Sequence, residues 1–71
     1  MKFQVTYHAR DRLEMRGISL EDIKYVLRNS KSRDQHGDAC RVEGTTHSGL
    51  LRVVYTKRGN RYTIITAYYV D

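Results

Sequence analysis

One histidine and two arginines recur at four-residue spacing near the start of the chain, at His8, Arg12 and Arg16. Positions four and eight residues apart lie on one side of an α-helix, so a helix here would align the three side chains. Histidine titrates near neutral pH and can transfer protons, and arginines can hold a phosphate and offset transition-state charge. This stripe therefore suits phosphodiester chemistry. The alternative is a histidine that caps or packs at a helix start beside two solvated arginines.

Hydroxyl-bearing side chains mark the last segment, where residues 61–70 read RYTIITAYYV. Strand alternation puts Thr66 and Tyr68 on one face, together with Tyr62 and Ile64. Hydroxyl groups can hydrogen-bond phosphate oxygens, and tyrosine rings can stack on bases. Threonine and tyrosine also favour strands in general, so the pattern alone fits an ordinary strand as well.

The charge of the chain favours a polyanionic partner. Thirteen Lys and Arg stand against eight Asp and Glu in 71 residues, a formal net charge of +5, and nine of the thirteen are arginine. The planar guanidinium grips phosphate through two parallel hydrogen bonds, and nucleic acid is the commonest polyanion. Arg41, Arg52 and Arg61 lie on expected strands or strand ends. They would bind an RNA backbone if they share one face, and would be solubility charges if they do not.

Several kinds of protein are excluded by what the sequence lacks. The single cysteine, Cys40, rules out an intrachain disulfide and a zinc site built from several cysteines. The spacing of His, Asp and Glu fits no metal site, so we expect neither a metal nor another cofactor. We find neither a secretion signal nor an apolar run of about 20 residues that could cross a membrane. We therefore expect a cytoplasmic protein.

Periodicity, turn residues and capping residues predict a single domain over residues 1–71. The expected elements in order are a strand over Lys2–Val5, a helix over Tyr7–Arg16, a second helix from Ser19 to Arg28, a polar loop over Asn29–Asp38, and strands over Ala39–Glu43, Leu50–Lys57 and Arg61–Val70, with turns at Gly44–Gly49 and Arg58–Asn60. The expected fold class is α+β, of order βααβββ. A helical hairpin hinged at Gly17 packs on one face of a four-stranded antiparallel sheet and leaves the other face open.

The segment Tyr7-His8-Ala9-x-x-Arg12-Leu13-x-x-Arg16-Gly17-Ile18-Ser19 resembles the opening of a small bacterial family, domain of unknown function 4258. Its members also end on a strand similar to Ile64-Ile65-Thr66-Ala67-Tyr68, so the likeness extends from about Thr6 to Tyr68. That family in turn resembles the barnase, EndoU, colicin and RelE group of ribonuclease toxins. In that group a helical hairpin backs a four-stranded antiparallel sheet, and RNA is cut without a metal.

The resemblance implies a metal-independent endoribonuclease of toxin type, in which the ribose 2′-oxygen attacks the adjacent phosphorus and leaves a 2′,3′-cyclic phosphate. His8 matches the histidine proposed as catalytic. Arg12, with Arg16 or a strand arginine, would stabilise the phosphorane, and Thr66 or Tyr68 would orient the phosphate. Implied partners are RNA, free or on the ribosome, and an antitoxin or immunity protein.

The chain departs from an ideal enzyme in having only one histidine in the motif, so a second proton-transfer group is not obvious. The alternative function is a non-catalytic module that binds RNA or a protein, as a regulator or an inhibitor.

Overall fold

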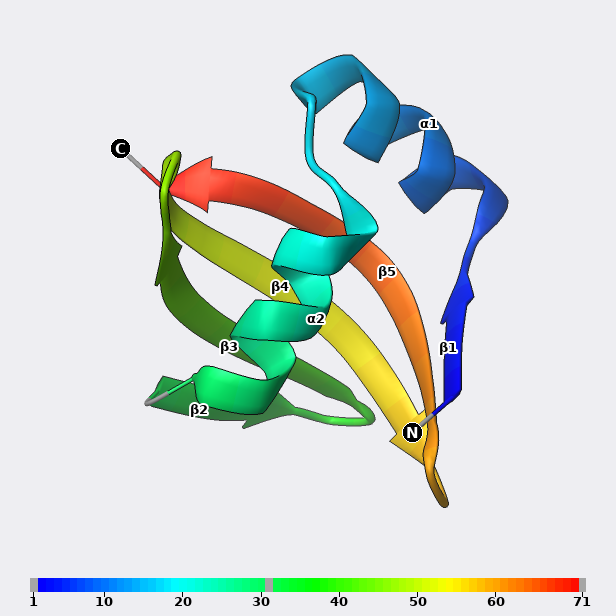
Figure 1. The fold of residues 1–71 in the computed structure, drawn as a ribbon. Helices are drawn as coiled ribbons and strands as arrows, with labels where there is room; N and C mark the ends of the chain where they lie inside the picture. Colours follow the sequence, from blue (N-terminus) through cyan, green and yellow to red (C-terminus); the bar gives the residue numbers. More distant parts are fainter. Residues whose placement is uncertain (1, 31, 71) are drawn as a thin grey trace.

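A five-stranded mixed sheet with two helices forms the fold (Figure 1). The computed structural model of the chain describes residues 2–30 and 32–70. In chain order the elements are β1 (Lys2–Val5), α1 (Tyr7–Arg16), α2 (Leu20–Asn29), β2 (Ser32–His36), β3 (Ala39–Thr46), β4 (Gly49–Arg58) and β5 (Arg61–Val70). The strand order is β1-β5-β4-β3-β2, with β1 parallel to β5 and the other neighbours antiparallel.

Both helices begin and α1 ends as the capping residues predict. The Thr6 hydroxyl accepts a hydrogen bond from the Ala9 amide at 3.1 Å, and the Ser19 hydroxyl accepts one from Asp22 at 3.1 Å. Gly17 ends α1 in the left-handed conformation, with φ of 65°, which glycine adopts without steric cost. Neither helix of the described residues has the length and apolar character needed to cross a membrane.

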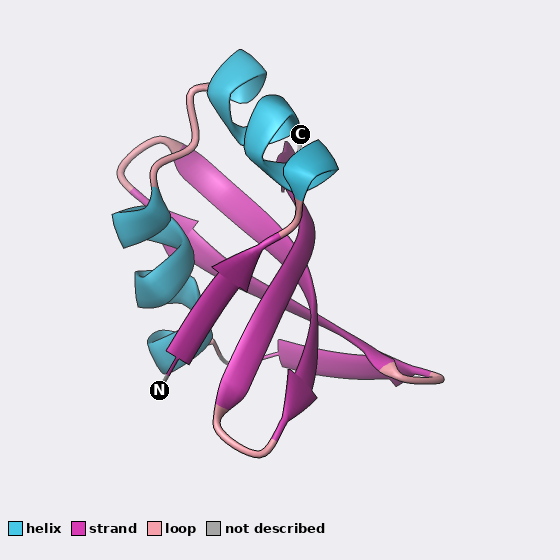
Figure 2. Cartoon of the chain, turned by 90° about the vertical axis from the view of Figure 1, so that its right-hand side faces the viewer, coloured by secondary structure: helices cyan, strands magenta, loops and turns pink. Residues whose placement is uncertain are grey.

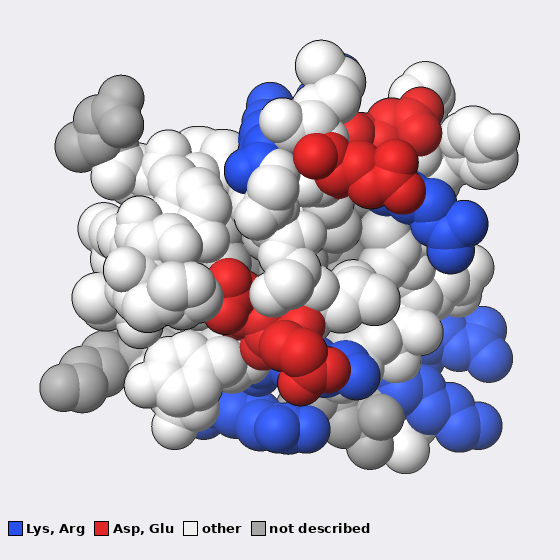
Figure 3. Space-filling model, turned by 45° about the horizontal axis from the view of Figure 1, so that its top comes forward, with Lys and Arg blue, Asp and Glu red and all other residues white. Residues whose placement is uncertain are grey.

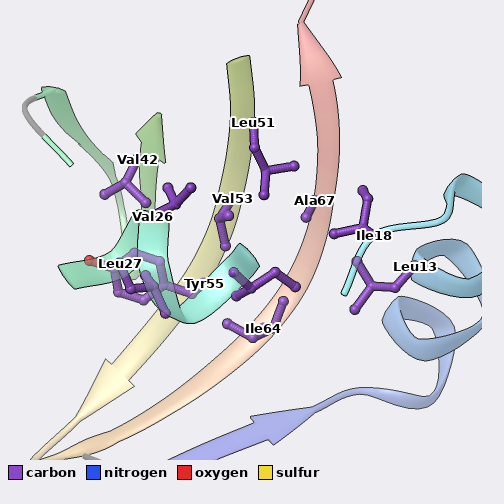
Figure 4. Packing of buried hydrophobic residues seen from close by; sticks show 11 residues of the cluster. Leu13, Ile18, Val26, Leu27, Val42, Leu51, Val53, Tyr55, Ile64 and Ala67 are labelled. Atoms are coloured by element: carbon purple, nitrogen blue, oxygen red, sulfur yellow. The ribbon is translucent and has the colours of Figure 1, made fainter. Parts of the chain in front are cut away.

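The expected fold class, a helical hairpin on a four-stranded antiparallel sheet of the RelE or barnase kind, is wrong. The sheet has a fifth strand and is mixed, and the helices pack on different strands, α1 on β5 and α2 on β3 and β4. Ile18, in the link between the helices, is itself buried in the core and lies beside Ala67 with Leu13 (Figure 4). Because Ile18 packs in the core, the link between the helices lies against the sheet. The two helices therefore cover different strands.

The strand that the sequence did not predict is β2, which lies within the expected loop Asn29–Asp38. It pairs with β3 from Ser32↔Glu43 to His36↔Ala39 and stands at the edge of the sheet. Residues 33–38 are all exposed, so this strand buries no apolar side chain and shows no hydrophobic alternation. Polar edge strands of this kind also resist pairing with other chains.

The hairpin turn between β3 and β4 is shorter than expected. β3 continues to Thr46 and β4 begins at Gly49, so the turn consists of His47 and Ser48 where the sequence predicted a turn over Gly44–Gly49. The Thr46 hydroxyl closes this turn, because it accepts from the Ser48 amide at 3.1 Å and donates to the Gly49 carbonyl at 3.2 Å. The tight turn fixes the register of the two strands.

A β-bulge in β5 decides which side chains face the core. Val54 is opposite Thr66 and Tyr55 is opposite Ile64, so Ile65 is an extra residue in β5. Before the bulge, Ile64 points into the core, and after it Ala67 does. Thr66 and Tyr68 therefore point away from the core. The expectation that they share a face with Tyr62 and Ile64 is wrong.

The core lies between one face of the sheet and the two helices (Figure 4). It consists of Leu13, Ile18, Ile23, Val26, Leu27, Val42, Leu51, Val53, Tyr55, Ile64 and Ala67. Gly44 on β3 lets α2 approach closely, because a Cβ atom there would lie 3.2 Å from a methyl group of Val26. Figure 2 shows the helices gathered on one side of the sheet and the opposite face turned away from them.

Candidate nucleic-acid interface

The face of the sheet opposite the core, which we call the open face, is polar and basic. Residues directly opposite each other on paired strands share a face, so the register defines its rows. The rows are Thr45, Leu50 and Val70; Glu43, Arg52 and Tyr68; Arg41, Val54 and Thr66; Ala39, Thr56, Thr63 and Gln4; and Arg58, Arg61 and Lys2. The strand arginines Arg41, Arg52 and Arg61 thus share one face.

Bases outnumber carboxylates on the open face. Five of its residues are Lys or Arg, and two carboxylates accompany them, Glu43 within the rows and Asp34 on β2 opposite Arg41. Both carboxylates form ion pairs, Asp34 with Arg41 at 3.2 Å and Glu43 with Arg52 at 2.6 Å. The remaining bases, Lys2, Arg58 and Arg61, have no ion pair among the described residues, so the face carries a positive charge that an anion could meet.

Arg52 is held by both of its neighbours in the row. Its Nε donates to Glu43 Oε1 at 2.7 Å and its Nη1 donates to the Tyr68 hydroxyl at 3.1 Å. The guanidinium also lies 5.5 Å from the centroid of the Tyr68 ring. The hydrogen bonds with Tyr68 and with Glu43 raise the pKa of Arg52. The row is therefore a fixed group in which the Tyr68 hydroxyl keeps its own proton to donate to a ligand.

Arg16 connects α1 to the rim of the open face. Its Nη1 donates to the Ala67 carbonyl at 2.8 Å and to the Thr66 hydroxyl at 3.4 Å. These bonds lie beyond Ile64, where the pairing of β1 with β5 ends. The side chain therefore closes part of the β5 edge and orients α1. The structure thus gives Arg16 a structural role, and its expected part in RNA binding stays a prediction.

His8 and Arg12 lie on α1 and are exposed. They precede Arg16 by eight and four residues, which sets them about 12 Å and about 6 Å from it along the helix axis, on the same side of the helix. Since Arg16 reaches Thr66, that side of α1 borders the open face along β5. Through Arg16 the structure thus connects the helix motif to the strand motif.

The expected site residues fall into three groups. Arg16, Thr66, Tyr68 and Arg52 are joined through hydrogen bonds or share the open face in consecutive rows, and Arg41 lies in the row of Thr66. His8 and Arg12 are exposed on α1, eight and four residues before Arg16. Arg61 lies at the far end of the face, seven residues and about 20 Å along β5 from Tyr68.

Sequence reasoning missed Glu43, Lys2 and Arg58 as members of the site. The signal for Glu43 was its place opposite Arg52, since unlike charges pair across strands. That signal is readable only when the His47–Ser48 turn and hence the register are known. Lys2 joins the site because β1 is parallel to β5, which local periodicity does not reveal.

The helix side of the molecule has a different charge pattern. Four acidic residues lie on the helices, Asp11, Glu14, Glu21 and Asp22. Figure 3 shows the acidic side chains of this side in two groups with basic side chains next to them. Within residues 2–30 and 32–70, His, Cys, Asp and Glu form no group of three or more that could hold a metal ion. The helices carry five bases beside these four acidic residues, whereas the open face has five bases and only two carboxylates, so the excess of positive charge is larger on the open face.

Comparison with known proteins identifies a family and no further relatives. Neither a curated protein nor a solved structure matches the chain. The family described as Domain of unknown function (DUF4258) matches residues 5–69. This range contains both helices, β2, β3, β4 and most of β5, with the helix motif at His8 and the strand motif at Thr66. The chain belongs to the DUF4258 family.

Proposed function

We propose that the chain is a metal-independent endoribonuclease that holds single-stranded RNA on the open face and cleaves it at the rim beside α1. The observation that carries this proposal is the hydrogen bond from Arg16 to Thr66, which joins the His8, Arg12 and Arg16 stripe to the hydroxyl-bearing end of β5. Imidazole, guanidinium and hydroxyl groups thus border one surface. These groups can act on a phosphodiester without a metal.

In the proposed reaction a base removes the proton of the ribose 2′-hydroxyl, and the 2′-oxygen attacks phosphorus. The bond from phosphorus to the 5′-oxygen breaks, an acid protonates this oxygen, and the products end in a 2′,3′-cyclic phosphate and a 5′-hydroxyl. His8 supplies one of the two proton transfers. Arg12 offsets the charge of the phosphorane, and Thr66 and Tyr68 orient the phosphate. Tyr68 is a candidate for the second proton transfer, since its hydroxyl accepts the bond from Arg52 and its own proton is not used in that bond.

The experiment that tests this function is a cleavage assay in EDTA on mixed-sequence RNA and on message bound to translating ribosomes. We expect the wild type to produce 2′,3′-cyclic ends on at least one of the two substrates. His8→Ala should lower the rate by about 10²- to 10⁴-fold, the usual contribution of a general acid or base. Because His8 is exposed, the variant should keep the wild-type melting temperature.

His47→Ala is the matched control, since His47 is also exposed but lies in the turn between β3 and β4. It should cleave as fast as the wild type. Equal cleavage by wild type and His8→Ala would remove His8 from the mechanism. A wild type that cleaves neither substrate would reject the enzymatic function.

The second candidate is a non-catalytic RNA-binding module, and one observation favours it. Arg52 donates hydrogen bonds to Glu43 and Tyr68, and Arg16 donates one to the Ala67 carbonyl. These two arginines therefore have fewer N–H donors left to stabilise the charge of a phosphorane. Such a module would bind RNA in a salt-dependent manner without turnover. In either case we propose that the protein is cytoplasmic. We also propose a protein partner of the antitoxin or immunity kind, which would block the function by covering the open face.

A further inference from the structure

The end of the open face nearest the β4–β5 turn contains a hollow of about 370 Å³. Its charged side chains are Lys2, Arg58 and Arg61, which come from three different strands. Arg61 is directly opposite Arg58 on β4 and directly opposite Lys2 on β1. Of the described residues that line this hollow, none is a carboxylate. We call it the turn hollow.

Three bases placed side by side repel one another, and like charges directly opposite on paired strands destabilise a sheet. A bound anion would relieve this repulsion. The ion pairs Arg41–Asp34 and Arg52–Glu43 show how the rest of the open face balances its charge. The turn hollow has no such internal partner among the described residues, so its charge is available to a ligand.

Neutral hydrogen-bonding groups complete the turn hollow. The hydroxyls of Thr56 and Thr63 and the amide of Gln4 lie in the adjacent row and line the same hollow. β1 is fixed against the turn because the Lys2 amide donates to the Asn60 carbonyl at 2.8 Å. The side chains therefore extend from a rigid framework of three paired strands. Ammonium, guanidinium, hydroxyl and amide groups together are the donors that proteins direct at phosphate oxygens.

We propose that the turn hollow is a second phosphate site, which binds the backbone of the same RNA strand at a distance from the cleavage rim. The inference rests on the proposed function for the identity of its ligand. Arg58 lies six residues from Arg52 along β4, or about 20 Å at the usual rise of a strand. Between them the open face presents Val54 and Thr56, so a strand can cross the sheet without meeting a carboxylate of these rows.

This geometry makes a prediction about length. An RNA of two nucleotides is too short to reach both the cleavage rim and the turn hollow, whereas one of twelve nucleotides spans the distance. Removing the charge of the hollow should therefore weaken the binding of long strands and leave short strands unaffected.

The test measures the affinity of labelled 2′-O-methyl RNA of two and of twelve nucleotides, which resists attack by the 2′-oxygen. The double variant Arg58→Gln/Arg61→Gln should bind the twelve-nucleotide strand about tenfold or more weakly at low salt, and the magnitude of its salt slope should fall by about 1.4, which is about 0.7 for each lost phosphate contact on a single strand. The two-nucleotide strand should bind the double variant with the same affinity as it binds the wild type. Arg10→Gln/Arg28→Gln, two exposed helix arginines, is the control with the same change of net charge.

Equal loss in the control variant, or equal loss for both strand lengths, would overturn the proposal, because the effect would then come from net charge alone. Unchanged binding of the long strand would overturn it directly. If the double variant weakened the binding of inorganic phosphate but not of RNA, the hollow would be a free-anion site and the RNA assignment would fail. Since these strands cannot be cleaved, a failed cleavage assay leaves this result standing, and an overturned hollow leaves the cleavage result standing.

Discussion

The Glu43–Arg52–Tyr68 row limits what its arginine can offer to RNA. A guanidinium has five N–H donors, and Arg52 directs Nε and Nη2 at Glu43 and Nη1 at Tyr68. On the proposed function, a phosphate bound at this row would therefore meet a partly neutralised arginine whose position is already set. This arrangement favours orientation of the ligand over raw attraction, since a fixed donor loses little freedom when the ligand binds.

Tyr55 gives a prediction about stability at high pH. Its side chain is 1% exposed, and burial raises the pKa of its phenol. A folded-state pKa above the unfolded value near 10 means that the stabilising contribution is complete below about pH 10 and is lost as the pH rises through the folded pKa. The free energy of unfolding of the wild type should therefore fall above pH 10. Tyr55→Phe cannot ionise and should lose less.

Urea denaturation at pH 8 and pH 11 measures this difference. Tyr25→Phe is the matched control, because Tyr25 is 52% exposed and should leave the alkaline loss of the wild type unchanged. An equal loss of stability in Tyr55→Phe and wild type between the two pH values would show that other groups cause the alkaline effect.

Elements with a hydrophobic period or a clear cap were predictable from the sequence. β1, α1 and β5 have the predicted bounds, and Thr6, Gly17 and Ser19 cap the helices as expected. β2 was not predicted, because an edge strand that buries nothing has no apolar alternation. The parallel pairing of β1 with β5 was not predicted either, since it joins residues about sixty positions apart in the chain.

The bulge at Ile65 shows the same limit within the site. The sequence identified Thr66 and Tyr68 as candidates but put them on the wrong face. Side chains alternate strictly between the two faces of a strand only when no extra residue is inserted. The sequence contained one indication of this bulge. Ile64 and Ala67 are three residues apart and both apolar, so they share the core face only if one residue between them is extra.

The contact between α2 and β3 gives a prediction about packing. Gly44→Val would place side-chain atoms against Val26, whose methyl group would lie 3.2 Å from the new Cβ. Overpacking of this kind costs about 1–3 kcal/mol of unfolding free energy. Removing methyl groups in Gly44→Val/Val26→Ala should relieve the clash, so the double variant should lose less stability than the sum of the single variants.

Urea denaturation of the two single variants and the double variant measures this coupling. Strict additivity of the three free energies would show that residue 44 does not limit the approach of α2. A Gly44→Val protein as stable as the wild type would show that the helix moves away at no cost.

At the scale of the whole molecule, the fold separates two tasks. The helices cover the core face of the sheet and carry acidic and basic residues in nearly equal number (Figure 3), while the opposite face carries five bases and two carboxylates. A chain of 71 residues buries only about 60% of the surface that it exposes when unfolded, so a deep cleft is not available to it. A polyanion that lies flat on a sheet suits this size, because its affinity comes from charge spread over a surface.

The salt dependence of RNA binding tests this view of the open face. Each phosphate neutralised on a single strand contributes a slope of about −0.7 to the logarithm of the affinity against the logarithm of the salt concentration. Contacts by Lys2, Arg58 and Arg61 alone should therefore give about −2. If RNA also displaces Asp34 and Glu43 from Arg41 and Arg52, all five bases contribute and the slope approaches about −3.5.

Fluorescence anisotropy of a labelled 2′-O-methyl strand between 50 and 300 mM KCl (roughly the range over which such slopes are resolved) measures this slope. Glu43→Gln separates the two cases. It leaves a slope near −2 unchanged if Arg52 makes no phosphate contact. It strengthens binding if the wild type must first break the ion pair. A slope near zero would contradict a phosphate-binding face, and would instead favour a protein as the partner that covers the sheet.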